Sequence, residues 1–365
     1  MQSYLDRMSK LLLEGNKLRE SKPRDEVRTI ARALTLTTLK KLDGTRKASL
    51  LLFLHESFLI KKGTGNIIDL LGADLRGVEK PINFPESSLR GTNISTDESL
   101  TDLAGSNLMG ADLSEAMLHS VILNNAKLSN AIFKKAVLSH SSLRGANLRE
   151  ADLEGAYLLS AKFNRADLSE ANLNNTQLDK ADLSGAKLAN AKLSASLSEA
   201  ILIGAELVNT DLSRASLIKS DLSRAYLFQA KLCKAHLDDA NLSNTDLRWA
   251  DLSEAYLWGA NLNNAEINNA NLQSANLSEV QLIEANLRAA NLSNSRLFRA
   301  KLNGAKLNNA DLTNADLTLA DLSNADLSNA KLDGAILDGA IRDGTIITEE
   351  QLKTVASLND VFIPN

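Results

Sequence analysis

One residue in every five is apolar along most of this chain, and this period constrains the fold more than any other feature. The rule runs through residues 103–193 and, after one residue is skipped, through residues 197–337. Ala stands two positions before 38 of the 48 apolar centres. The centres comprise 45 Leu together with Phe133, Phe163 and Ile267. A pattern of this length predicts a repeat architecture in which neighbouring units stabilise one another.

A period of five fits neither an α-helix nor an unbroken β-strand. On a helix, five residues advance the side-chain direction by about 140°, so the leucines would spread around the axis. On a flat strand, odd spacing would place successive leucines on opposite faces. The conflict disappears if the chain turns a corner in each quintet, with the small residue and the Leu inward and the residue between them outward. Residues typical of turns fill the last two positions, and four corners would close a coil in about 20 residues.

The consensus is plainest in the segment 310–320, which reads Ala-Asp-Leu-Thr-Asn-Ala-Asp-Leu-Thr-Leu-Ala. This pattern closely resembles the pentapeptide repeat family, and the resemblance covers roughly residues 101–345. It implies an all-β solenoid, a right-handed quadrilateral β-helix with four quintets per coil. We expect a small N-terminal α-helical domain and a short C-terminal capping helix to flank this β-helix.

The chain divides into four regions in this interpretation. Uncapped β-edges invite aggregation, so both ends of a solenoid need a cover. A register slip is expected near residues 97–101. The regions are a helical N-terminal domain at 1–70, an irregular start of the solenoid at 71–100 with an interruption at 79–86, the pentapeptide-repeat β-helix at 101–345, and a C-terminal cap at 346–365.

The N-terminal region carries the periodicity of amphipathic helices. A first helix places Leu5, Met8 and Leu12 on one side, and two more are expected over residues 23–43 and 46–60. The part of this region between residues 27 and 59 is similar to the N-terminal segment of many cyanobacterial pentapeptide repeat proteins. Some of those proteins continue into membrane spans, which are not expected here.

Two further signals concern the solenoid itself. Thr348 and Gln351 have the spacing of a capping box, which predicts a short capping helix from Thr348 onward. The residue missing between Leu193 and Leu197 predicts a tightened or looped corner, with a functional loop as the alternative.

Composition narrows the classes of function. Residues 1–70 hold 14 Lys/Arg against 8 Asp/Glu, whereas the whole chain carries a net charge of −4. Neither part has the charge density of a nucleic-acid binder, so no direct nucleic-acid binding is expected. No apolar stretch is long enough to span a bilayer, and the N-terminus lacks the apolar core of a signal peptide. A cytoplasmic location is the expectation, and membrane association is disfavoured.

Catalytic chemistry finds little support in the sequence. His119 and His140 are spaced to be neighbours on adjacent coils, but no carboxylate or Cys pattern completes a metal site. Cys233 is the single cysteine, which excludes a disulfide scaffold, and its register points it outward. Walker, G-x-G-x-x-G and nucleophile-elbow motifs are absent from the sequence. We therefore expect a protein that is not an enzyme, with no cofactor, no metal and no catalytic residue.

Recognition is the better prospect, because a coil of four quintets would gather the few outward rings on particular faces. Rings accompanied by Arg are typical of interface hot spots, whereas single exposed rings are ordinary. The candidate protein-binding face comprises Ile218, His236, Tyr256, Trp258, Arg296, Phe298 and Arg299. A second candidate patch on the opposite face comprises Tyr226, Phe228, Arg248 and Trp249.

Three functions follow from these expectations. The first is a non-catalytic scaffold that binds another protein, with a cyanobacterial regulator as the version that the family resemblance suggests. The second is a DNA mimic that binds DNA gyrase, as the quinolone-resistance branch of the family does, although basic residues dilute the acidic field here. The third is peripheral membrane association through the basic N-terminal region. The alternative for this region is that its helices simply cap the solenoid and pack on it. A homodimer through a coil end stays open.

Overall fold

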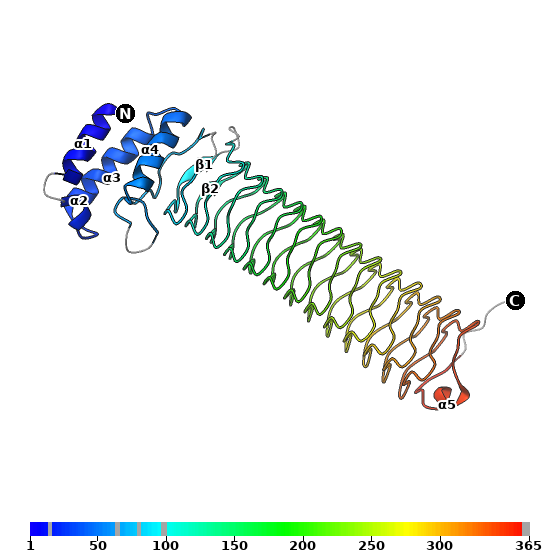
Figure 1. Ribbon diagram of the computed structural model, residues 1–365. Helices are drawn as coiled ribbons and strands as arrows, with labels where there is room; N and C mark the ends of the chain where they lie inside the picture. Colours follow the sequence, from blue (N-terminus) through cyan, green and yellow to red (C-terminus); the bar gives the residue numbers. More distant parts are fainter. Residues whose placement is uncertain (14–16, 63–65, 79–81, 96–100, 360–365) are drawn as a thin grey trace. The chain divides into compact units, whose positions relative to one another are not determined.

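The computed structural model divides into two compact units, Met1–Gln177 and Leu178–Asn365. The first unit holds the four N-terminal helices and the coils that follow them, and the second holds further coils and a short helix (Figure 1). The residues that the structure describes are 1–13, 17–62, 66–78, 82–95 and 101–359.

The described residues at the start of the first unit form four helices, where the apolar periodicity predicts three. The additional helix, α2, is a single turn, which is too short for a periodic pattern to reveal. Asp43 caps α4, because its side chain accepts the backbone N–H of Arg46 at 2.9 Å. The helices are α1 Gln2–Leu13, α2 Lys17–Glu20, α3 Glu26–Leu39 and α4 Gly44–Glu56.

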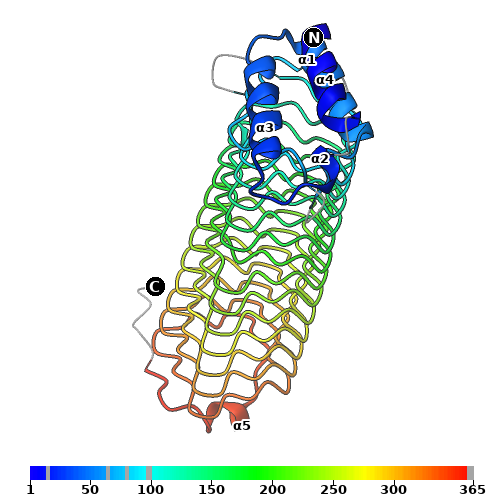
Figure 2. The same ribbon diagram turned by 90° about the vertical axis from the view of Figure 1, so that its left-hand side faces the viewer.

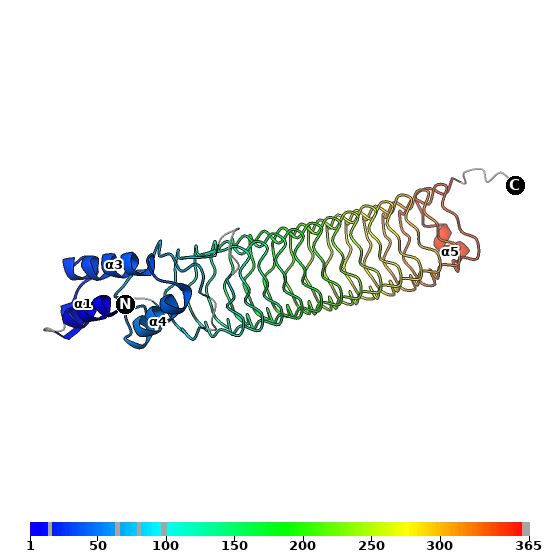
Figure 3. The same cartoon turned by 90° about the horizontal axis from the view of Figure 1, so that it is seen from above.

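The apolar side of α1 packs against α3. Tyr4, Met8 and Leu12 are buried, and Tyr4 Oη lies 2.9 Å from Thr35 Oγ1. Burial raises the pKa of Tyr4 to about 12, against the opposing effect of the hydrogen bond with Thr35. Figure 3 shows α1 and α3 side by side. The apolar stripe of α1 thus packs inside the protein. Of the three residues predicted for this stripe, Met8 and Leu12 are buried and Leu5 is half-buried.

The fourth helix, α4, contacts the first quintets of the same unit. Lys47 is buried, and its Nζ donates to the carbonyl oxygen of Arg76 at 2.9 Å and lies 3.6 Å from Asp74 Oδ1. A Cβ on Gly44 would overlap the carbonyl of Gly77, so the two backbones approach closely. A hydrogen bond from Arg76 is the main reason that the pKa of Asp74 is lowered to about 2.

Each quintet is a short extended segment followed by a corner. In one quintet, Ala255 and Leu257 are buried, whereas Tyr256 between them is exposed. The Leu257 carbonyl accepts the N–H of Ala260 at 3.1 Å, which closes the corner as a four-residue turn. Gly259, the third residue of that turn, has a φ of 65°, and nearly all other quintets also have a positive φ there. The predicted alternation of inward and outward positions is confirmed.

Successive coils pair in parallel through single-residue bridges. His236 pairs with Tyr256 and Tyr256 with Asn276, so each coil consists of four quintets. Among the described residues, only β1 (Asn93–Ser95) and β2 (Met117–Leu118) form named strands, and these two pair in parallel. A corner in every quintet keeps the extended segments this short. Figure 2 shows the coils stacked in register within each unit.

The coils begin earlier than the sequence predicts. Residues 68–72 already form a quintet, with Ile68 and Leu70 buried and a positive φ at the last residue. Within the interruption expected at 79–86, residues 82–86 form another quintet around the buried Phe84, and this part of the prediction is wrong. Pro fits there because it takes the turn position that follows the central residue, where its fixed φ is compatible.

The other parts of the predicted interruption and register slip fall on residues outside the described set. Residues 79–81 and most of the predicted slip at 97–101 are not described. The bridge between Ser88 and Asp112 spans the slip and joins residues further apart in sequence than four quintets, whereas Asp102 pairs with Ile122 at the regular spacing. The coil between Ser88 and Asp112 is therefore longer than the regular coils, whereas Asp74 and Asn93 before it pair at one position short of four quintets.

The residue skipped between Leu193 and Leu197 shortens one coil of the second unit. Asp182 pairs with Ile201, which is one position short of the regular spacing of four quintets. Residues 191–198 contain no positive φ, so the position that is lost is the one that ordinarily turns the corner in the left-handed conformation. Of the two predicted outcomes, the corner is tightened rather than looped.

A short helix, α5 (Glu349–Leu352), covers the last coils of the second unit. Thr348 accepts the N–H of Gln351, whose side chain accepts the N–H of Thr348 in return, so the predicted capping box is confirmed. Gln351 Nε2 also donates to the carbonyl oxygens of Leu327 and Ala330 at 2.7 and 2.9 Å. At Ala330, this amide replaces the backbone N–H that a further coil would otherwise provide, as Lys331 does for the carbonyl of Ala310.

Candidate functional site

The Asp or Asn before each central Leu supports the corner that follows it. Asp221 Oδ1, for example, accepts the N–H of Ser223 at 2.9 Å and the side-chain amide of Asn241, one coil on, at 3.0 Å. This role was not predicted, although the prevalence of Asp and Asn at the position is its sequence signal. The same bond to the residue two positions on is made by Asp152, Asp167, Asp182, Asp211, Asp251, Asp311, Asp316, Asp321 and Asp326.

These carboxylates therefore belong to the repeat rather than to an acid–base pair. At Asp321, burial acts to raise the pKa, but hydrogen bonds from Ser323 and Asn303 outweigh it and the pKa is lowered. An Asp held in its charged form by turn hydrogen bonds is a poor proton donor near neutral pH. The outward Asp columns thus support the fold.

The candidate protein-binding face, called the aromatic face below, lies on coils of the second unit. His236 and Tyr256 stack with ring centroids 4.5 Å apart and an angle of 7° between their planes. Parallel bridges continue the column from Tyr256 to Asn276 and on to Arg296. Tyr256 and Trp258 are each 44% exposed, which is large for rings of this size.

A second column of the aromatic face runs through the first corner position. Trp258 lies on this column, and Phe298 follows it two coils further on, with Ser278 between them. The Arg299 guanidinium lies 5.0 Å from the centroid of the Phe298 ring. Ile218 and Phe298 are half-buried, and Arg296 is exposed. The register therefore places all seven predicted residues on one face and its adjoining corner.

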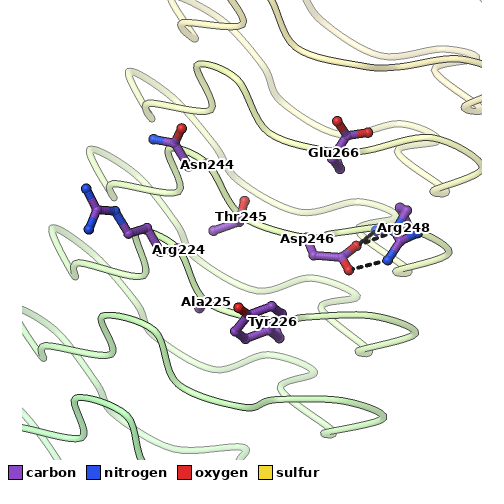
Figure 4. A pocket seen from close by; sticks show the side chains of 8 residues that line it. All are labelled: Arg224, Ala225, Tyr226, Asn244, Thr245, Asp246, Arg248 and Glu266. Atoms are coloured by element: carbon purple, nitrogen blue, oxygen red, sulfur yellow. Dashed lines mark hydrogen bonds and ion pairs between the residues drawn. The ribbon is translucent and has the colours of Figure 1, made fainter.

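The second candidate patch lies on the opposite face of the coil and surrounds a shallow pocket (Figure 4). Tyr226 lies beside the pair formed by Asp246 and Arg248, whose atoms are 2.7 Å apart at the shortest. Hydrogen bonds from Arg248 are the main cause of the lowered pKa of Asp246. The Arg248 guanidinium also lies 5.7 Å from the Phe228 ring centroid. The pocket is lined by Arg224, Ala225, Tyr226, Asn244, Thr245, Asp246, Arg248 and Glu266.

Trp249 completes the second patch from a strained position. It has a φ of 61°, which is uncommon for a bulky side chain, and it is 57% exposed. Opposite charges balance around the pocket, because Arg224 and Arg248 are offset by Asp246 and Glu266. The patch therefore lacks the surplus of one charge that would select an ionic ligand.

His119, His140 and Cys233 are the side chains that metal or redox chemistry would use. His119 and His140 are neighbours as predicted, with ring centroids 5.2 Å apart. Within the described part of the chain, no group of three or more His, Cys, Asp or Glu side chains could hold a metal ion. Cys233 is a free thiol of intermediate exposure. Across these same described residues, none of the helices has the length and apolar character needed to cross a membrane.

Parallel coils of four quintets, buried leucines at every fifth position and corners at a fixed place define a pentapeptide solenoid. The sequence model for pentapeptide repeats matches the chain in overlapping segments between residues 99 and 339. The chain thus belongs to the pentapeptide repeat family. Proteins of this family fold as right-handed quadrilateral β-helices.

Solved structures of the same family resemble parts of the chain. HetL, a pentapeptide repeat protein involved in heterocyst differentiation regulation from Nostoc sp. strain PCC 7120, is 34% identical, with 65% of this chain and 91% of HetL covered and a TM-score of 0.25. Full-length QnrB1, a plasmid-mediated fluoroquinolone resistance protein, is 17% identical over 50% of this chain and 93% of QnrB1, with a TM-score of 0.30. Among curated protein sequences, none matches significantly.

Proposed function

We propose that this chain is a non-catalytic scaffold that binds another protein through the aromatic face. The observation that carries the proposal is the ring column, in which His236 stacks on Tyr256 and Trp258 stands exposed beside them. Exposed aromatic side chains flanked by Arg supply large contact areas at low entropic cost, which is the composition of interface hot spots. In this proposal the coils are right-handed, as in the family, and the protein acts in the cytoplasm.

The coil provides the rigidity that such a site needs. Within the second unit, backbone hydrogen bonds tie each coil to the next, so the rings are held in fixed order before a partner arrives. A preorganised surface loses little conformational entropy on binding. A regulatory role in a cyanobacterium is the finer form of this proposal, and it rests on the resemblance of the N-terminal segment.

The two alternatives receive less support. A DNA mimic needs an uninterrupted field of carboxylates, whereas basic side chains such as Lys134 and Lys234 pair with Glu residues on the outside of the coils. Membrane association through the N-terminal region would use the apolar stripe of α1, which is packed against α3. The DNA mimic and membrane association are each distinguished from the proposal by affinity capture.

Affinity capture from host lysate with the full chain tests the proposal. We expect a partner that the wild type and Trp249→Ala retain and that the double variant Trp258→Ala plus Phe298→Ala loses. Trp249→Ala is the matched control, because it removes an exposed indole from the opposite face. A partner retained by the double variant would refute binding through the aromatic face. Capture of DNA gyrase would favour the DNA mimic, and capture of lipid vesicles alone would favour the membrane.

A further inference from the structure

The corner column of the aromatic face is apolar at every second coil. Ile218, Trp258 and Phe298 occupy it on alternate coils, and Asp238 and Ser278 occupy the coils between. Parallel coils are about 4.8 Å apart, so the apolar side chains recur at about 9.6 Å. A linear ligand that follows the column must present a contact at this interval.

The interval distinguishes between backbone conformations of a bound segment. A polyproline II helix has three residues per turn and a rise of about 3.1 Å, so one of its edges repeats every ~9.3 Å. A β-strand repeats on one face every ~6.6 Å, and an α-helix advances about 5.4 Å per turn. Over the two intervals from Ile218 to Phe298, the repeat of a polyproline II helix and the spacing of the apolar side chains differ by less than about 1 Å in total.

Hydrogen-bonding groups on the face complement such a helix. Within the described residues, the Tyr256 hydroxyl, the Trp258 indole N–H and the Arg296 guanidinium make no side-chain hydrogen bond to another residue. A polyproline II segment has no internal hydrogen bonds, and each Pro offers a carbonyl but no N–H. The face therefore offers donors to a ligand rich in acceptors.

Charge defines the ligand further. Lys219 at one end of the column, and Arg296 and Arg299 at the other, form no ion pair within the described residues. Of the nearby acids, Glu254 is paired with Lys234 at 3.2 Å, and Asp238 accepts the N–H of Trp258. Asp239 and Glu279 also face this edge, so the acids lie between the cations at the two ends of the column.

From this spacing, donor set and charge, we propose that the aromatic face binds a proline-rich segment of its partner in the polyproline II conformation, carrying acidic residues. Every third residue of the segment packs beside Ile218, Trp258 and Phe298, and its carboxylates pair with the cations at the two ends. The inference rests on the proposed function and specifies what kind of protein segment is bound. Aromatic side chains are also what other protein modules use to hold polyproline II ligands.

Tryptophan fluorescence of the full chain tests this proposal, because the sequence contains only two Trp residues. In the variant Trp249→Phe, Trp258 is the sole reporter and lies on the aromatic face. We expect the synthetic peptide (Pro-Pro-Glu)₅ to change this fluorescence saturably. It should bind at least about tenfold more tightly than the charge-reversed (Pro-Pro-Lys)₅ and the flexible acidic (Gly-Ser-Glu)₅.

Two variants locate the binding. Phe298→Ala, made in the Trp249→Phe background, should weaken (Pro-Pro-Glu)₅ by about tenfold. In Trp258→Phe, the remaining Trp249 on the opposite face should report no change on addition of peptide. Unfolding midpoints matched to the wild type establish that both variants are folded.

Three results would overturn the proposal. These are equal binding of (Gly-Ser-Glu)₅, equal or tighter binding of (Pro-Pro-Lys)₅, and no response of Trp258 to (Pro-Pro-Glu)₅ at millimolar concentration. If the peptide fails while the lysate partner is still lost in the Trp258→Ala plus Phe298→Ala variant, the polyproline inference falls and protein binding stands. If both fail, the proposed function falls as well.

Discussion

The helices of residues 2–56 and the coils of residues 178–359 bury their side chains by different rules. In the coils, position within the quintet alone decides whether a side chain is inside or outside. In the helices, burial is individual, and even a lysine, Lys47, is buried with its Nζ against a backbone carbonyl. Because the coil fold uses only part of each quintet, its outward positions can change without loss of the core.

The strongest test of this comparison is the interior of the coil. Ala255→Phe places a ring where the interior accommodates Ala, which is 0% exposed, and should destabilise the second unit by about 3 kcal/mol or more. Glu254→Asn, one residue earlier at an outward corner, should change stability by less than about 0.5 kcal/mol. Guanidinium unfolding followed by Trp fluorescence measures both. Equal midpoints for the two variants would contradict the rule that position decides burial.

The next test concerns the individual contacts of the helices. Lys47→Ala removes the donor to the Arg76 carbonyl and a neighbour of Asp74, and should cost about 2 kcal/mol. The matched control is Lys234→Ala, which breaks an exposed pair with Glu254 in the coil and should cost less than about 1 kcal/mol. The helical circular dichroism signal during unfolding reports the first variant. A cost at Lys47 no larger than at Lys234 would remove the distinction between the regions.

A smaller effect sharpens the role of the residue before each Leu. Asp221→Ala removes the acceptor for the N–H of Ser223 and the amide of Asn241, and should cost about 1 kcal/mol. Asp221→Asn keeps an acceptor at the same place and should lose at most half of that. If the two variants unfold at the same denaturant concentration, the corner hydrogen bond does not stabilise the coil.

An aromatic residue at a corner position with positive φ should lower the stability of the coil. Trp249→Asn should stabilise the second unit by about 0.5–1 kcal/mol, because Asn adopts a φ near 61° more readily than Trp. Trp258→Asn is the control, since Trp258 does not have a positive φ. Thermal unfolding compares them, and a gain in the control as large as in Trp249→Asn would refute strain as the cause.

A further effect is a pH dependence in the first unit. The side-chain hydrogen bond from Arg76 is the largest of several effects that lower the pKa of Asp74 from 3.8 to about 2, so the stability it contributes is complete above pH 3.8 and is lost as the pH falls towards 2. Arg76→Ala should reduce this loss between pH 4 and pH 2, measured as the slope of helix unfolding free energy against pH. An unchanged slope would show that Asp74 is not held by Arg76.

Much of the coil could be predicted because the sequence repeats its own register. The column of Trp258 and Phe298 follows from counting four quintets at a time, and so does the adjacency of His119 and His140. The stacking of His236 on Tyr256 and the placement of Arg299 over Phe298 could not be predicted, because they depend on rotamers chosen among several neighbours.

Three other features of the structure differ in how well the sequence indicates them, and each difference has a physical reason. Asn and Gly at the last corner position mark the positive φ, since these residues tolerate it. The interruption predicted at 79–86 contains Pro85, yet a turn accepts Pro where its fixed φ fits. The buried Lys47 had no sequence signal, because lysine is ordinarily solvated and only its particular carbonyl partner allows burial.

The most direct test of the central claim is a photo-crosslink from the full chain. A benzoylphenylalanine introduced at position 258 or at position 249 places the same reactive group on opposite faces of the coil. We expect the partner from host lysate to crosslink to position 258 and not to position 249. Equal crosslinking from both positions, or crosslinking from position 249 alone, would contradict the assignment of the aromatic face as the binding surface.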